Sequence, residues 1–432
     1  MPKLSPLLLV LLVGSNLTSV SLYAAEEGAE KTHKSGYDRK PEFSGPDSPK
    51  GQLEENDRVK EAAFRFPAFD GLFTNWNSFK QELDNQYGLK FGGHYSTMYQ
   101  TNGDESYFSG NFRLTSTWTV LGKDTATPGF ISLIADNRHS YGDYDAPGNF
   151  GNFGQYGITA TQFGDFDGNF KILTLAWNHK FSEDSGYVIG SYDPNDYMNV
   201  QGYVSPQTSF SNMSILLETS VNLPDTSWGV AAGHWFNDSW YVQGGINDAN
   251  GFGGDGNEWF AGGAEFFKWT HLGWSPSKDD RYYKNFHIAA WHADERDERI
   301  SDNFRGQEEV WGMSAAFNWT FNQQFMPFVK AGFSEGDHTF FNNTFAAGMM
   351  YKFMSSSDLI GIGGHWGRFS NDRDLGDGLA GESQISTEIF YRFQFSQNLA
   401  ITPSIQYIDN PLLSANSDGS ETIFGVRARF VY

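Results

Sequence analysis

The chain ends on the stretch TIFGVRARFVY (residues 422–432), in which two kinds of side chain alternate. One parity is apolar and finishes on an aromatic residue, with Phe424, Val426, Ala428, Phe430 and Tyr432. The other parity carries Arg427 and Arg429. Because successive side chains of a strand point to opposite faces, this pattern predicts a strand with one apolar face and one face that holds two guanidinium groups. A terminus that stops within such a strand is expected to pair with another strand rather than to fray.

The same alternation recurs over most of the chain after Gly88. Clear examples are NFRLTSTWTVL (111–121), WGMSAAFNWTF (311–321) and ISTEIFYRFQF (385–395). Each segment is about ten residues long and has aromatic residues near its ends, a pattern typical of membrane-spanning strands with their apolar face toward lipid. A single such strand also fits a soluble sandwich, but its repetition favours a barrel. We therefore predict an all-β fold, a transmembrane antiparallel β-barrel.

The number of strands follows from the lengths of the connections. About seventeen segments are candidate strands: 88–100, 107–121, 129–139, 169–181, 185–193, 212–220, 227–236, 239–247, 263–275, 282–293, 307–321, 324–334, 339–353, 358–367, 383–396, 398–408 and 421–432. Bacterial single-chain barrels have an even number of strands, so one candidate must be wrong. Along a barrel, short periplasmic turns such as 396–398 should alternate with long outer loops such as 409–420. This alternation holds over the whole chain only if residues 194–226 form a single outer connection. Segment 212–220 then belongs to a loop and sixteen strands remain, the last of which pairs with the first near Gly88.

Residues before the barrel divide into three parts. Residues 1–25 combine Lys3, an apolar run and a series of small residues, which predicts a secretory signal peptide. Residues 26–70 are rich in mixed charge, Pro and Gly and are predicted to form a mostly disordered periplasmic tail, with a short helix around 53–63 as an alternative. Residues 71–87 predict a short helix that is capped at Asn75 or Asn77 and ends at Gly88. This helix is either a packing element or a plug at the pore mouth, and the barrel occupies residues 88–432.

Composition excludes several classes of protein. The 432 residues include no cysteine, which excludes disulfides and thiolate metal sites. A formal net charge of −22 argues against nucleic acid as a partner, because phosphate binding needs a basic surface. After the signal peptide, no apolar run approaches the roughly 18–20 residues that a membrane helix requires.

Two motifs suggest chemistry but lack the context that it needs. GFGGDG (251–256) has the spacing of a dinucleotide-binding loop, yet no helix is predicted after it. An EF-hand loop would need a ligand where Phe252 stands. WHADERDER (291–299) offers a histidine beside carboxylates, but no matching nucleophile is evident, RHS (138–140) being the nearest candidate. We therefore predict no cofactor, no metal and no catalytic residue, with an outer-membrane hydrolase as an alternative.

Polar-parity residues of the strands are predicted to line the pore. Those on strands are Arg113, Glu388, Arg392, Arg427 and Arg429. The start of the long connection adds Asp193, Asp196 and Tyr197. Mixed arginine and carboxylate groups can bond hydroxyl groups from either side, which suits neutral polyols, whereas an anion pore would carry mostly Lys and Arg. The connection 194–226 is expected to fold inward and to narrow the pore.

Several longer stretches carry a family resemblance. They include YDPNDYMNV (192–200), GHWFNDSWYVQGGINDANG (233–251), EIFYRFQFSQNLAITPSIQYIDNP (388–411) and FGVRARFVY (424–432). In these stretches the chain resembles the OprB-type carbohydrate-selective porins of bacterial outer membranes, from about residue 85 to its end. The resemblance implies a sixteen-stranded outer-membrane barrel that passes small sugars by diffusion through a constriction.

The expected partners are outer-membrane lipid, small sugars in transit and the barrel assembly machinery, which would bind the C-terminal strand. Whether the protein is a monomer or a homotrimer is left open at this stage. A non-selective general porin is the second alternative to a sugar pore.

Overall fold

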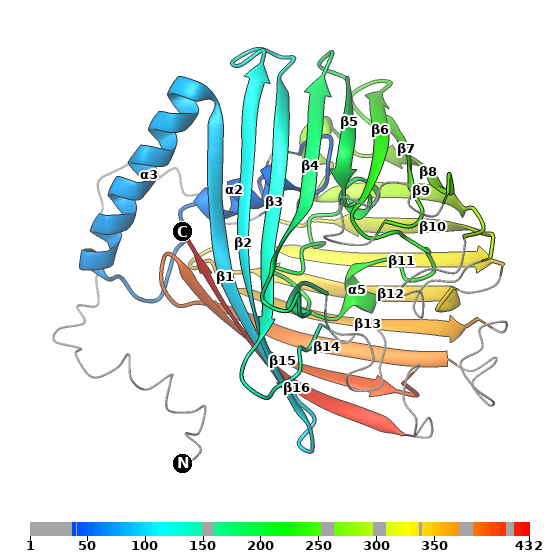
Figure 1. The fold of residues 1–432 in the computed structure, drawn as a ribbon. Coiled ribbons are helices and arrows are strands. Elements are labelled where there is room, and N and C mark those ends of the chain that lie inside the picture. The colour runs from blue at the N-terminus through cyan, green and yellow to red at the C-terminus, as the bar shows by residue number, and fades with distance from the viewer. Residues whose placement is uncertain are drawn as a thin grey trace.

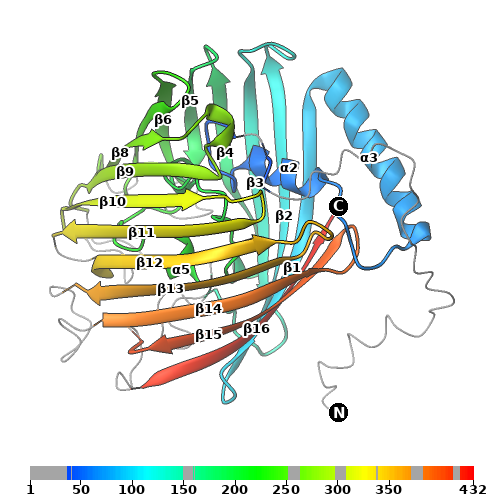
Figure 2. The ribbon, with the colours of Figure 1, turned by 180° about the vertical axis from the view of Figure 1, so that it is seen from behind.

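The computed structural model describes residues 37–39, 41–148, 159, 161–251, 263–296, 308–336, 339–370, 383–411 and 419–432. Within these ranges sixteen antiparallel strands form a closed barrel, in which each strand pairs with its neighbours in sequence and β16 pairs with β1 (Figures 1 and 2). The predicted fold class and strand number are confirmed.

The strands begin and end close to the predicted bounds. They are β1 (Leu89–Thr101), β2 (Ser106–Leu121), β3 (Gly129–Ser140), β4 (Phe170–Lys180), β5 (Ser185–Tyr192), β6 (Ser227–Trp235), β7 (Trp240–Asp248), β8 (Phe266–Trp274), β9 (Lys284–Ala293), β10 (Val310–Trp319), β11 (Phe325–Glu335), β12 (Phe341–Lys352), β13 (Leu359–Phe369), β14 (Ser383–Gln394), β15 (Leu399–Asp409) and β16 (Ser420–Val431). The rejected candidate 212–220 is not a strand, since it contains the short helix α5 (Met213–Leu216) in the connection between β5 and β6.

Side chains alternate between the two faces of the wall as the sequence predicts. On β14, Ile385 and Ile389 are 42% and 44% exposed, whereas Glu388 and Arg392 between and beyond them are buried. Apolar side chains therefore cover the outside, where lipid surrounds a membrane barrel, and polar side chains point inward. None of the helices in the described part of the chain is long and apolar enough to span a membrane.

The two terminal strands form the seam that closes the barrel. β1 pairs antiparallel with β16 from His94 opposite Val431 to Thr101 opposite Phe424. Beyond the ladder, the Tyr432 backbone N–H donates to the Gly93 carbonyl at 3.1 Å, and the return bond measures 3.3 Å. The C-terminal strand is thus paired along its length, as its sequence pattern predicts.

The N-terminal part of the chain differs from the expectation. Residues 41–66, called the N-terminal segment below, are ordered and contain the helix α2 (Pro49–Asp57), which lies within the ring of strands (Figures 1 and 2). Ser48 caps α2 through its side chain, and Leu53 is buried. The prediction of disorder is wrong for these residues, because their polar and aromatic groups find partners on the inner wall. Residues 26–36 lie outside the described ranges.

A second helix, α3 (Pro67–Tyr87), lies outside the barrel beside β1 (Figure 1). It begins at Pro67, so the predicted caps Asn75 and Asn77 are wrong, because both lie inside the helix. It ends at Gly88 in the left-handed conformation (φ 70°), as expected. The ring of Trp76 meets that of Phe91 on β1 at a centroid distance of 5.5 Å, so α3 packs on the wall next to the seam.

Substitution of Gly93 tests how closely β1 and β16 pack at the seam. A Cβ atom at Gly93 would lie 2.6 Å from Tyr432 Oη and would also meet the Arg113 carbonyl oxygen, whereas one at Gly364 on β13 has no neighbour closer than 3.6 Å. Since overpacking costs about 1–3 kcal/mol, Gly93→Ala should lower the temperature at which the folded barrel converts to its slower-migrating form on gels. Gly364→Ala should leave that temperature unchanged. Equal temperatures for the two variants would contradict the seam geometry.

Candidate functional site in the barrel lumen

The predicted lining residues on strands all lie on the inner face of the wall. Arg113 belongs to β2, Glu388 and Arg392 belong to β14, and Arg427 and Arg429 belong to β16. All five are less than a tenth exposed. Their burial shows that other parts of the chain cover them, and two segments do so.

The first covering segment is the connection between β5 and β6, residues 193–226, called the inner loop below. Glu388 accepts hydrogen bonds from the backbone N–H groups of Ser211 (3.0 Å) and Asn212 (2.7 Å) and from the Ser211 hydroxyl (2.8 Å). Arg427 donates to the carbonyl oxygens of Pro206 (2.6 Å) and Ser209 (2.7 Å). Two charged groups of the wall therefore hold the middle of the inner loop inside the barrel.

Further bonds attach the inner loop to other sectors of the wall. Thr219 Oγ1 lies 2.9 Å from His365 Nε2 on β13. Gln201 Nε2 lies 3.2 Å from His287 Nδ1 on β9. The inner loop thus reaches from one side of the lumen to the other.

Aromatic residues on the inner wall form the apolar part of this attachment. The Tyr203 ring of the inner loop stacks on Phe328 of β11 at 4.0 Å, and Phe210 meets Phe390 of β14 edge-on at 5.0 Å. Phe390 interrupts the otherwise polar inward parity of β14, and that interruption is a sequence signal that something packs on it. On β11, Phe328 shares the inward parity with the buried Met326.

The remaining predicted residues hold the start of the inner loop. Asp193 Oδ1 accepts the backbone N–H of Asn195 at 2.8 Å, at the start of the short helix α4 (Asn195–Met198). The Asp196 carbonyl oxygen accepts the Gly45 N–H at 2.5 Å, and Tyr197 Oη donates to Asn178 Oδ1 at 3.0 Å.

Asp196 is buried among other acidic groups. Burial, together with the neighbouring carboxylates of Asp193 and Asp47, raises the pKa of Asp196 well above its usual value, and Arg113 only partly opposes this. The side chain therefore favours its neutral form more than an exposed aspartate does.

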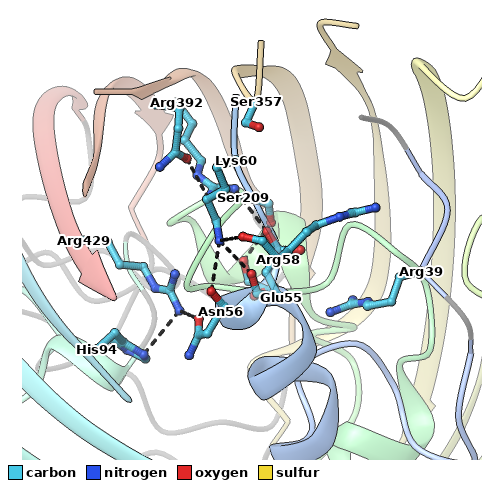
Figure 3. A network of polar contacts seen from close by, with 12 residues as sticks. Arg39, Glu55, Asn56, Arg58, Lys60, His94, Ser209, Ser357, Arg392 and Arg429 are labelled. Atoms are coloured by element: carbon cyan, nitrogen blue, oxygen red, sulfur yellow. Dashed lines mark hydrogen bonds and ion pairs between the residues drawn. The ribbon is translucent and has the colours of Figure 1, made fainter. Parts of the chain in front are cut away.

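The second covering segment is the N-terminal segment, which sequence reasoning missed. Arg429 Nη2 donates to Asn56 Oδ1 at 2.6 Å, and Arg113 Nη1 donates to Gln52 Oε1 at 3.5 Å. Arg392 Nη1 lies 3.8 Å from Glu55 Oε1, and Figure 3 shows Glu55 and Asn56 facing the arginines of the wall.

The N-terminal segment also contacts the opposite wall. Arg281, in the turn between β8 and β9, donates to the carbonyl oxygens of Glu42 (2.7 Å) and Phe43 (2.9 Å). Gln243 of β7 donates to the same Phe43 carbonyl at 2.7 Å, and Tyr282 Oη donates to the Ser44 carbonyl at 2.7 Å. Like the inner loop, the N-terminal segment spans the lumen.

Arg113 has an additional partner that the sequence analysis left out. Its Nε and Nη2 atoms donate to the two carboxylate oxygens of Asp136 on β3, at 2.6 and 2.7 Å. Arg138 approaches the same carboxylate at 3.0 Å. The pattern DNR (136–138), which places both charges on one parity, was the available signal. In the described ranges no three His, Asp or Glu side chains are grouped so that they could hold a metal ion.

A closed barrel with long outer loops, short turns on the other side and a polar lumen defines the class of outer-membrane porins. Residues 160–432 match the family model described as "Carbohydrate-selective porin, OprB family". The chain therefore belongs to the OprB family of carbohydrate-selective porins, and its place is the bacterial outer membrane.

One solved structure supports the fold, and a second shows a weaker similarity. The high-pH structure of Pseudomonas putida OprB is similar with a TM-score of 0.62 at 14% identity, over 83% of this chain and 97% of that one. The trimer form of Vibrio cholerae OmpT gives a TM-score of 0.49 at 13% identity, over 80% and 99% of the two chains. The search of curated proteins found no match.

Removal of the Glu388 carboxylate should loosen the inner loop. A hydrogen bond to a charged group contributes about 1.5–3 kcal/mol, and about 1.4 kcal/mol corresponds to one power of ten. Glu388→Ala is therefore expected to accelerate amide hydrogen exchange at Ser211 and Asn212 at least about tenfold. Glu335→Ala, at an exposed position on β11, is the control and should leave this exchange unchanged. Unchanged exchange in Glu388→Ala would show that the carboxylate does not hold the loop.

Proposed function

We propose that this protein is a passive pore for mono- and disaccharides and that the inner loop is its constriction. The observation that carries the proposal is the attachment of the inner loop to Glu388 and Arg427 on one side of the lumen and to His287 of β9 on another. A loop that is fixed inside the lumen leaves only a narrow passage between itself and the wall. Such a passage excludes large solutes.

The chemistry of the lumen supports an uncharged, hydroxyl-rich solute. Arg113 is paired with Asp136, and the Glu388 and Arg427 charges are bonded to the inner loop. A lumen whose charges are paired offers little attraction to free ions, yet its arginine N–H groups and carboxylate oxygens still suit hydroxyl groups.

Liposome swelling with a panel of solutes tests this proposal. Glucose and maltose should enter faster than amino acids and organic anions of similar size, because the paired lumen charges do not favour ions. Replacing both Arg392 and Arg427 by Ala should change the sugar rates, whereas Arg368→Ala, on the exposed face of β13, should not. If charged solutes enter as fast as sugars of equal size, the protein is a general porin.

We also propose that the assembly machinery of the outer membrane binds the C-terminal strand. The strand presents Phe424, Val426 and Phe430 on its outer face, all more than a third exposed. Tyr432 ends this apolar row, and its ring stacks on that of Phe112 at 5.8 Å.

Substitution of the last residue tests this second proposal. Tyr432→Ser should reduce the amount of heat-modifiable barrel in the outer membrane, and Tyr432→Phe should retain it, because only the apolar ring is needed. Tyr407→Ser is the matched control, since Tyr407 is an exposed aromatic residue on the outer face of the neighbouring strand β15. Equal amounts of barrel for the two serine variants would contradict a special role of the terminus.

A further inference from the structure

The wall next to α2 is rich in cations. Its inner face carries Arg113 on β2, Lys352 on β12, Arg392 on β14 and Arg429 on β16. Of these, Arg113 has a carboxylate partner on the wall itself, Asp136, at hydrogen-bond distance. The N-terminal segment supplies further oxygen atoms: the amides of Gln52 and Asn56 and the carboxylate of Glu55.

Glu55 is the carboxylate that the cations of the lumen surround. Burial alone would raise the pKa of Glu55, but the surrounding cations Lys352, Lys60, Arg392 and Arg39 outweigh it and lower the pKa to about 2. The carboxylate is therefore ionised at neutral pH and balances positive charge inside the lumen. Lys60 also donates to the carbonyl oxygens at the end of α2, those of Glu55 (2.9 Å) and Arg58 (3.1 Å), as Figure 3 shows.

The N-terminal segment is fixed at the periplasmic end of the barrel. The Lys60 N–H donates to Gln397 Oε1 at 3.0 Å, and the Phe64 N–H donates to the Phe395 carbonyl at 3.0 Å. Both acceptors belong to the short turn between β14 and β15. The Glu61 N–H bonds Ser357 in the turn between β12 and β13 at 2.9 Å. Attachment to several turns holds Glu55 at a defined height in the lumen.

Where this segment meets the wall, some buried polar atoms lack a hydrogen-bond partner. Within the described part of the chain, Asn56 Nδ2 and Arg429 Nε are buried and have no hydrogen-bond partner. Buried N–H groups usually find a partner, which can be water or a solute. Asn56, His94 and Arg429 lie together in Figure 3, with Arg429 bonded to both neighbours.

We propose that the N-terminal segment, residues 41–66, forms the periplasmic half of the selectivity filter, with the Glu55 carboxylate offsetting the positive charge of the wall and the Gln52 and Asn56 amide oxygens bonding its arginines. The inference rests on the proposed pore function. Without this segment, Lys352, Arg392 and Arg429 would lose the nearby carboxylate of Glu55, and the lumen would attract anions more strongly. Residues 41–66 lie outside the part of the chain that matches the OprB family, residues 160–432. The family match therefore says nothing about the role of the N-terminal segment.

Planar-bilayer recording in a KCl gradient tests the proposal with the full-length chain and two variants. Deletion of residues 41–66 should increase single-channel conductance several-fold and should shift the reversal potential toward that of chloride. Glu55→Gln retains the segment and removes one charge, so it should shift the reversal potential in the same direction with a smaller change in conductance. Asp124→Asn is the control, because it removes one charge from an exposed turn on the same side of the barrel.

The variants separate the ways in which the proposal can fail. If the deletion prevents folding, as a gel without heat-modifiable migration would show, Glu55→Gln decides alone. If the parent protein conducts but has the same reversal potential as Glu55→Gln and as any folded deletion variant, this inference is overturned. The proposed pore function would still stand. A folded parent protein that forms no channel would overturn the proposed function and this inference together.

Discussion

The structure depends on one constraint: in lipid, every backbone N–H and carbonyl group must find its partner within the protein. Strands meet this constraint only when the sheet has no free edge. The pairing of β16 with β1 removes that edge, and the bonds between Tyr432 and Gly93 complete it. The apolar exterior follows from the same closure, because one parity of every strand then faces lipid.

Closure creates a second constraint inside the barrel. The inward parity carries charged groups that are shielded from bulk water, and a buried charge is costly unless it is paired and hydrogen-bonded. Two segments from distant parts of the chain meet this need. The inner loop bonds Glu388 and Arg427, and the N-terminal segment bonds Arg429. The inner loop and the N-terminal segment therefore shape the lumen as much as the wall does.

Sequence reasoning was accurate where a residue's role depends on its own strand. It placed Arg427 and Arg429 on the inner face, and the structure has them there. It did not identify their partners, which the structure shows to be carbonyl and amide oxygens. It predicted disorder for residues 41–66, because compositional rules consider a segment alone, and the wall residues that order this segment, such as Arg113 and Arg429, lie 61 and 373 positions from their partners.

The sequence by itself determined the class of fold, the number of strands and the face on which each strand residue lies. The face of each residue follows from local periodicity, which a single stretch such as 422–432 displays, and the fold class and strand number follow from its repetition and from the lengths of the connections. Only the tertiary structure decided which groups meet in the lumen. The pairs Arg429–Asn56 and Glu388–Ser211 join residues 373 and 177 positions apart, and no local pattern encodes such distances. Barrel closure brings these residues together, and burial then selects their partners.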